Sequence, residues 1–235
     1  MLCSANLRIM SVCILQDRLL GLPAHLRNKA MRTLSFFAAS VVLVAAARAD
    51  QRTLGNGPQG PVFEAQVPYS RFLQINKGQR EDEWCWAASI SNVFAYYGHP
   101  VSQQRVVQRL FGAVVDMPAP SARQIAALLD VDWVDDGGRP FHSKLTAAFD
   151  VMAGVNALNN MTMIQNLQAN RPLIVCNTHH CMVITEITYT QFQVLSVGVF
   201  DPWPYGPETH SLSSAEMVPA PAGQLMFVGA VTVSN

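Results

Sequence analysis

Charged residues are scarce in this sequence, and the two signs are balanced. They make up 14% of the 235 residues, and 16 Lys and Arg residues match 16 Asp and Glu residues, so the formal net charge is zero. This balance gives no electrostatic reason to expect nucleic acid or an anionic lipid surface as a partner. Because hydrophobic residues make up 50% of the chain, the composition also excludes a disordered protein and favours one buried core.

A run long enough to cross a membrane is missing near the N-terminus, where a shorter apolar run occurs. Residues 34–47 follow the basic start Met31-Arg32 but fall short of the roughly 20 residues of a membrane helix. Ala47-Arg48-Ala49 then gives the small-x-small pattern of a signal-peptidase site. We therefore expect a signal peptide at residues 31–49, cleaved after Ala49, and a secreted or periplasmic protein without an integral membrane segment. An uncleaved N-terminal anchor is the alternative.

The rest of the chain divides into three further parts. Residues 1–30 show no sustained periodicity, and we interpret them as an over-long extension ahead of a true start at Met31. Residues 50–67 are rich in Gly, Pro and Gln, which predicts an extended, non-helical lead-in. Residues 68–235 have the size of one domain. Nothing in the pattern indicates an oligomeric state.

Cysteine is also rare, and its number is odd once the leader is removed. Cys85, Cys176 and Cys181 remain, and an exported protein carries them into an oxidising compartment. An odd count there predicts either an intermolecular bond or a free, reactive thiol. Cys176 and Cys181 flank a short loop, so they either pair with one another and leave Cys85 alone, or remain plain buried thiols.

Hydrophobic periodicity predicts helices first and strands later. Apolar residues at helical spacing, with capping residues or glycines at the ends, predict four helices: one from Cys85 to about Gly98, one between Ser102 and Gly112, one from Ser121 to Leu129, and one at residues 162–169. Four runs rich in Val, Ile, Thr and aromatic residues predict antiparallel strands at residues 173–176, 182–189, 192–200 and 225–233. This order predicts an α+β fold with a cleft between a helical half and a sheet half.

Cys85 stands in an unusual context for a cysteine. A thiol becomes a nucleophile as its thiolate, and the start of a helix favours the thiolate through unpaired N–H groups and the helix dipole. Cys85 begins the strongest predicted helix, between Trp84 and Trp86. The position predicts a nucleophile, although a lone cysteine in an apolar helix is more often structural.

The segment Trp84-Cys85-Trp86-Ala87-Ala88-Ser89 resembles the nucleophile segment of the compact bacterial branch of the papain-like cysteine peptidases. In that family a glutamine six positions before the cysteine donates to the oxyanion, and Gln79 stands there. A histidine that opens an apolar strand is matched by His180. The third member, which precedes Pro-Trp, is matched by Asp201. The resemblance covers roughly residues 67–235, nearly the whole of the expected mature chain.

The resemblance implies a papain-like α+β fold and an acyl-transfer mechanism on a peptide or polypeptide substrate, with no cofactor and no metal. Cys85 would attack a carbonyl, Gln79 and the Cys85 backbone N–H would stabilise the oxyanion, His180 would transfer the proton, and Asp201 would orient His180. The separation of Cys85 and His180 is shorter than the roughly 130–150 residues of papain-type enzymes. An Asp also replaces papain's Asn as third member. Both departures place the chain in a shortened branch.

Several alternatives compete with this interpretation. His179 competes with His180 for the role of base, and Asp201-Pro202 is also an ordinary turn start. Cys176, His179, His180 and Cys181 have the composition of a zinc site, but neighbours on a strand point to opposite faces. His99, His142 and His210 lie in polar or turn contexts that call for no role. A transferase or deamidase on the same scaffold, and a non-catalytic binding domain, are the alternative functions.

Overall fold

A large antiparallel sheet forms the centre of the molecule. The computed structural model describes residues 51–75 and 78–234, all within one unit of the chain, so the predicted N-terminal extension and signal peptide lie outside it. Seven strands follow one another across the sheet in the order β1-β2-β7-β6-β10-β4-β3, β5 pairs with β4, and β8 joins β7 to β9. The strands are β1 (Gln51–Gly57), β2 (Gly60–Gln66), β3 (Val131–Val134), β4 (Pro140–Asp150), β5 (Val155–Asn156), β6 (Leu173–Asn177), β7 (Cys181–Tyr189), β8 (Val194–Phe200), β9 (Thr209–Ser211) and β10 (Leu225–Ser234).

The helices begin and end largely where their capping residues predict. They are α3 (Tyr69–Ile75), α4 (Cys85–Tyr96), α5 (Gln103–Phe111), α6 (Ala122–Leu128) and α7 (Asn160–Gln168). The Ser121 side chain accepts the Gln124 N–H at the start of α6, which stabilises that helix end. Gly112 adopts φ 75° directly after α5, a conformation that favours glycine. The predicted α+β fold class is confirmed.

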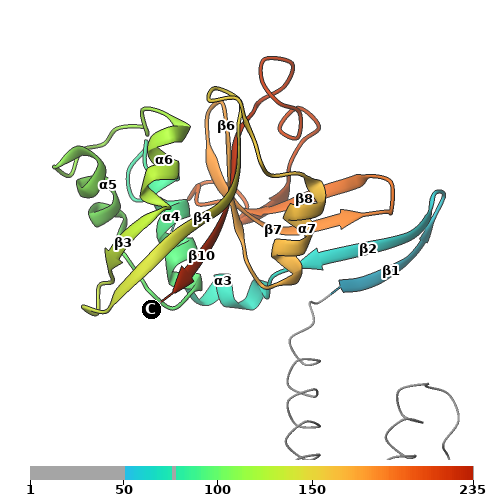
Figure 1. Cartoon of the computed structure of the whole chain (residues 1–235), viewed down its shortest axis with the longest axis horizontal. Helices are drawn as coiled ribbons and strands as arrows, with labels where there is room; N and C mark the ends of the chain where they lie inside the picture. The colour runs from blue at the N-terminus through green and yellow to red at the C-terminus, as the bar shows by residue number, and fades with distance from the viewer. Residues whose placement is uncertain (1–50, 76–77, 235) are drawn as a thin grey trace, which may run out of the picture. The chain divides into compact units, whose positions relative to one another are not determined.

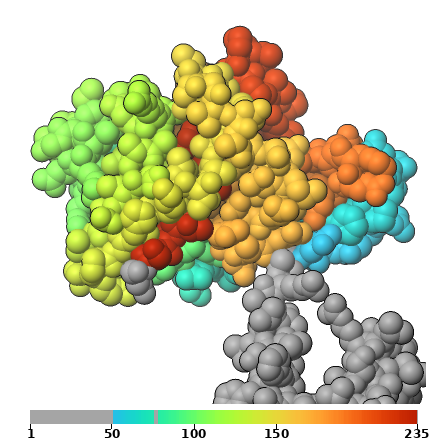
Figure 2. Space-filling model, viewed as in Figure 1, coloured from blue at the N-terminus to red at the C-terminus, as the bar shows by residue number. Residues whose placement is uncertain are grey.

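Helix α4 is the buried helix of the fold. Ten of its twelve residues are buried, among them Trp86, Ile90 and Phe94, because the helix packs on β6 and β7 on one side and on α5 and α3 on others. In Figure 1, α5 and α6 lie with β3 at one end of the sheet, and the β1–β2 hairpin lies at the other. In the space-filling view, residues from the middle of the chain flank and partly cover the C-terminal strand β10 (Figure 2). Deep burial on all sides makes α4 a rigid support for its first residue, Cys85.

Strand register brings two distant residues to one end of the sheet. In the antiparallel pair β7–β8, Val183 lies opposite Phe200, so the start of β7 lies beside the end of β8. His180 directly precedes β7, and Asp201 directly follows β8. His180 and Asp201 therefore lie side by side at the same end of this strand pair, just outside the strands themselves.

The sequence patterns missed seven elements: β1, β2, α3, β3, β4, β5 and β9. The segment expected as a lead-in is extended, but it forms the hairpin β1–β2, and β2 pairs with β7 through residues 63–66. Helix α3 and strands β3 and β4 were not predicted either. Strand β4 carries small and polar residues where β-branched ones mark a strand, yet it pairs with β10 over most of its length. Its pairing with β10 decides its conformation.

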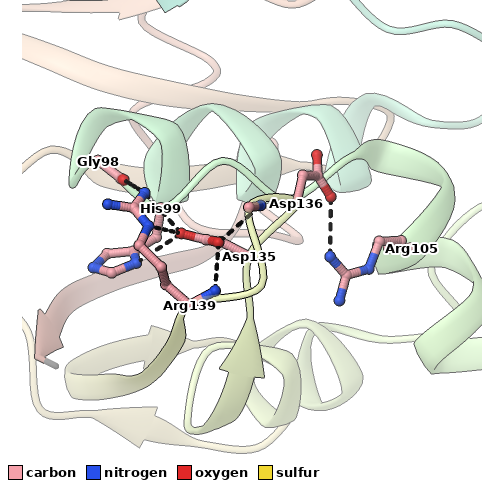
Figure 3. A network of polar contacts seen from close by, with 7 residues as sticks. Gly98, His99, Arg105, Asp135, Asp136 and Arg139 are labelled. Carbon is pink, nitrogen blue, oxygen red and sulfur yellow. Dashed lines mark hydrogen bonds and ion pairs between the residues drawn. The ribbon is translucent and has the colours of Figure 1, made fainter.

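A polar cluster fastens α4 to the β3–β4 turn, and Figure 3 shows it from close by. The carboxylate of Asp135 is fully buried, and it accepts the backbone N–H groups of Gly137 and Arg139, both at 2.9 Å. The Arg139 guanidinium donates to the same carboxylate at 2.8 Å, and His99 Nδ1 lies 3.2 Å from it. Burial raises the pKa of Asp135, but these hydrogen bonds outweigh it and hold the pKa below its usual value. This satisfied cluster has a structural role.

No helix among residues 51–75 and 78–234 is long and apolar enough to cross a membrane.

Candidate active site

The structure brings three of the predicted site residues together. His180 Nε2 lies 2.5 Å from Asp201 Oδ1, and Cys85 lines the same cavity as His180, near enough for its thiol to raise the pKa of His180. Because Nε2 is engaged by Asp201, the nitrogen left to face the thiol is Nδ1. Cys85 is partly exposed and is the one free cysteine among the residues that the structure describes. His179 is exposed, and the histidine that pairs with Asp201 is His180.

Two opposing effects act on the titration of His180. Burial of the ring lowers its pKa, but hydrogen bonds to Asp201 and Cys85 and the charges of these two groups outweigh it and raise the pKa to about 9. Asp201 shows the complement. Burial raises its pKa, whereas hydrogen bonds from His180 and from the Trp203 backbone N–H, with the charges of His180 and His210, lower it. At neutral pH the pair is therefore an imidazolium and a carboxylate.

The two tryptophans beside Cys85 hold one wall of the site in place. Trp84 Nε1 donates to the Val115 carbonyl at 2.8 Å, and Trp86 Nε1 donates to the Met117 carbonyl at 3.2 Å. Between these contacts, the Glu83 N–H donates to Asp116 Oδ1 at 3.0 Å. The segment that continues into Pro118 is thus tied to the residues that flank the nucleophile. Their indoles serve the architecture of the site.

A cavity of about 700 Å³ opens beside Cys85. Residues 118–123 line one side, and residues 150, 152, 153 and 176–181 line others. Apolar surface comes from Trp86, Ile125, Met226 and Phe227. Both Cys85 and His180 reach this space, so a bound chain would meet the thiol and the imidazole together. The volume and the apolar lining with a few polar groups are typical of a ligand site.

Gln79 lies near the site in a way that the sequence did not predict. Its side chain is buried, and Nε2 donates to the carbonyls of Glu81 at 3.0 Å and Asp82 at 2.8 Å, while Oε1 has no hydrogen-bond partner. Both amide hydrogens are used within the turn that precedes α4. The Gln79 backbone N–H donates to the Pro202 carbonyl at 2.7 Å, which joins this turn to the loop after Asp201. An oxyanion role for Gln79 stays a prediction.

The two remaining cysteines are bonded to one another. Cys176 and Cys181 face each other across β6 and β7, with Cα atoms 4.0 Å apart, and form a disulfide at the base of the turn that carries His180. Their sulfurs are therefore unavailable as zinc ligands, which the alternative of a zinc site at Cys176, His179, His180 and Cys181 would require. Among the residues that the structure describes, no group of three or more His, Cys, Asp or Glu side chains could hold a metal ion.

Sequence reasoning missed two neighbours of the pair. The Trp203 backbone N–H donates to Asp201 Oδ1 at 2.8 Å, and its ring lies edge-on to the His180 ring, with centroids 6.3 Å apart. His210 Nδ1 lies 3.7 Å from Asp201 Oδ2. Trp203 was visible in the Asp-Pro-Trp pattern, but no role was drawn for it. Nothing in the local sequence of His210 connects it with Asp201.

A protein-family model matches a stretch of the chain that includes Cys85, His180 and Asp201. The model of the Peptidase_C39 like family matches residues 65–216. No curated protein sequence matches the chain. A solved structure described as a double glycine motif protease from an AMS/PCAT transporter, in complex with the leader peptide, is 15% identical, with a TM-score of 0.38 over 78% of this chain and 96% of that one. UfSP from C. elegans is 13% identical, with a TM-score of 0.39 over 80% of this chain and 34% of that one.

Proposed function

The chain belongs to the Peptidase_C39 like family and is a cysteine-type peptidase, and we propose that it cleaves peptide bonds with the triad Cys85, His180 and Asp201 through a thioester acyl-enzyme. One observation carries the proposal: His180 is paired with the Asp201 carboxylate, lies near enough to the Cys85 thiol for that thiol to raise its pKa, and lines the same cavity as Cys85. A nucleophile, a base and a group that orients the base are the minimum for this chemistry.

Acylation begins at the start of α4. The Cys85 thiolate attacks the carbonyl carbon of the scissile bond, and the negative charge passes to the carbonyl oxygen. The Cys85 backbone N–H, one of the unpaired donors at a helix start, stabilises that oxygen. Gln79 becomes a second donor when its Nε2 releases one of the two turn carbonyls to which it donates. His180 Nδ1 then gives its proton to the leaving amine. The C–N bond breaks, and the acyl group remains on sulfur as a thioester.

Deacylation uses the same residues in reverse order. Neutral His180 takes a proton from a water molecule, the hydroxide attacks the thioester, and the Cys85 thiolate leaves as the carboxylic acid product forms. Asp201 keeps accepting the Nε2–H throughout, which fixes the ring orientation and leaves Nδ1 to face the reacting atoms. The substrate class is peptide or polypeptide, bound in the 700 Å³ cavity.

Labelling with an electrophile tests the assignment of the nucleophile. The mature protein is treated with iodoacetamide at near-neutral pH, digested and mapped by mass spectrometry. Cys85 should be labelled rapidly, and His180→Ala should slow that labelling. Cleavage of a fluorogenic peptide library gives the second readout, with Cys85→Ala as the inactive reference. Slow labelling of Cys85 that His180→Ala leaves unchanged, or full cleavage activity in Cys85→Ala, would overturn the proposal.

We also propose that the mature enzyme acts outside the cytoplasm, after removal of residues 31–49. The Cys176–Cys181 disulfide supports this, because such bonds persist in oxidising compartments. Expression with the native leader should give an exported protein whose first residue is Asp50, read by N-terminal sequencing of the product. A cell-retained product that still begins at Met1 or Met31 would contradict export.

A further inference from the structure

The turn that carries His180 is shaped by one asparagine. Asn177 Oδ1 accepts the backbone N–H of His179 at 2.8 Å and that of His180 at 2.7 Å. The Asn177 backbone N–H donates to the His180 carbonyl at 2.9 Å, so both backbone polar groups of His180 are bonded to this one residue. The backbone position of His180 therefore depends on where the Asn177 side chain is held.

A carboxylate from a distant segment holds that side chain. Asn177 Nδ2 donates to Glu216 Oε1 at 3.0 Å, and Glu216 Oε2 accepts the backbone N–H and the hydroxyl of Ser213, both at 2.8 Å. Burial raises the pKa of Glu216, but these bonds and the charge of His210 outweigh it and lower the pKa. Glu216 is thus a carboxylate at neutral pH, and each of its oxygens has a defined donor.

The two carboxylates near His180 act on different parts of it. Asp201 binds the ring at Nε2, whereas Glu216 reaches the backbone through Asn177. Fixing the ring alone leaves the turn free to shift, and a displacement of about 1 Å in a reacting group can cost about a hundredfold in rate. The Cys176–Cys181 disulfide restrains the base of the turn but not its tip.

We propose that Glu216, acting through Asn177, is a positioning residue that sets the place of His180 relative to Cys85. The inference rests on the proposed function, because it concerns the base of the same triad. Glu216 touches neither the cavity nor the reacting atoms. Its role would be to hold the turn in the conformation in which Nδ1 meets the thiol.

A donor–acceptor swap tests the proposal. Asn177→Asp keeps an oxygen for the two N–H groups but sets a second carboxylate against Glu216, so the turn should move. The double variant Asn177→Asp/Glu216→Gln restores the contact in reverse, since the new amide donates to the new carboxylate and its oxygen still accepts from Ser213. The double variant also keeps the net charge of the native pair.

The readout is the rate of Cys85 alkylation by iodoacetamide between pH 5 and 9. A thiol paired with an imidazolium stays reactive well below pH 8, whereas an ordinary thiol, with a pKa of about 8.5, loses its thiolate there. At pH 6 we expect Asn177→Asp to react about tenfold more slowly than the native protein, and the double variant to return to within about threefold. A loss of stability alone would not change the shape of this pH profile.

Asn159→Ala is the matched control. Asn159 Oδ1 accepts the Thr162 N–H at 2.9 Å at the start of α7, a bond of the same kind with no path to His180. This variant should melt at a lower temperature and keep the native alkylation profile. If Asn177→Asp does not fold, the variant Ser213→Ala takes its place. Ser213 is exposed, and its hydroxyl is one of the donors to Glu216. Loss of this hydroxyl should slow alkylation at pH 6 about twofold to threefold.

The outcomes separate this inference from the proposed function. A native profile in Asn177→Asp, or a double variant as slow as Asn177→Asp, would overturn the positioning role. If His180→Ala itself leaves the alkylation profile unchanged, the triad fails. If His180→Ala abolishes reactivity at pH 6 and Asn177→Asp does not affect it, the triad stands and only the role of Glu216 is refuted.

Discussion

Two His–Asp pairs in this molecule differ in what surrounds them. Asp135 is fully buried and accepts bonds from Arg139 and His99 (Figure 3) and from Gly137. His99 also stacks on Phe141, with ring centroids 4.6 Å apart. Asp201 accepts from His180 and the Trp203 N–H on one oxygen, and its other oxygen lies 3.7 Å from His210. The second histidine has a thiol as its other partner and a cavity in front of it.

The comparison teaches that a His–Asp pair alone carries no function. The Asp135 carboxylate accepts more hydrogen bonds, one of them from Arg139, which also donates to the Gly98 carbonyl. These bonds hold the β3–β4 turn against the end of α4. The Asp201 pair leaves a ring nitrogen for a reacting group. Five experiments sharpen or break this contrast.

The largest expected difference is between the two histidines. His180→Ala should lower kcat by roughly 10²–10⁴, the usual contribution of a general acid–base group, and should lower the melting temperature only by the loss of its ion pair with Asp201. His99→Ala should leave kcat unchanged and lower the melting temperature, since it removes a partner of the buried Asp135 and a ring from the core. Steady-state kinetics with thermal melts of both variants is the measurement. A fully active His180→Ala would erase the contrast.

The next prediction compares two buried glutamines that contact the turn before α4. Gln79→Ala should cost roughly 10²–10³ in kcat if Gln79 donates to the oxyanion. Gln103 holds the same turn from α5, because its side chain binds Gly78 O at 2.9 Å and the Arg80 N–H at 3.1 Å, so Gln103→Ala is the control for a loosened turn. Equal losses in kcat would assign Gln79 to the turn alone.

A third prediction concerns pH. The pKa of His180 is raised to about 9 from 6.5, so its stabilising contribution is complete below pH 6.5 and is lost as the pH rises through about 9. The alkaline limb of kcat/KM should lie near pH 9 as well, and Asp201→Asn should move it to lower pH, because a bond that favours the imidazolium is removed. A limb that stays in place would deny Asp201 this role.

The Asp135 cluster should respond at the opposite end of the pH scale. The pKa of Asp135 is lowered, so its contribution is present above its ordinary value of 3.8 and is lost as the pH falls through the lowered value. Asp135→Asn should therefore lower the melting temperature by several degrees at pH 7 and by less in strong acid, with kcat unchanged. A difference in melting temperature between Asp135→Asn and the native protein that stays constant down to strong acid would contradict this.

The smallest effect is expected from reduction of the disulfide. The bond closes a short loop, so in the chain-entropy model it contributes only about 2 kcal/mol to stability. It also restrains the turn that carries His180. Mild reduction should therefore lower activity about threefold or more while the melting temperature falls by only about 4–8 °C. A large drop in melting temperature with unchanged activity would assign the bond to stability alone.

Local signals predicted those elements that carry their own caps. The glycines after α4 and α5, and the Ser121 cap of α6, mark helix ends that the structure reproduces. Strands β4 and β2 have no such marks, since each pairs with a strand far along the chain, β10 and β7 respectively. Pairing between residues far apart in the chain leaves no fixed spacing in the sequence, which is why these strands escaped prediction.

The sequence by itself determined the kind of chemistry: a cysteine at a helix start, a histidine that opens a strand, and an aspartate that closes the next one. The tertiary structure decided which atoms meet. The β7–β8 register sets His180 beside Asp201. Asn177, which binds Glu216 39 residues further along the chain, accepts two N–H groups of the turn that carries His180. Residue types follow from local composition, whereas distances of a few ångströms between remote side chains depend on how the whole sheet packs against α4.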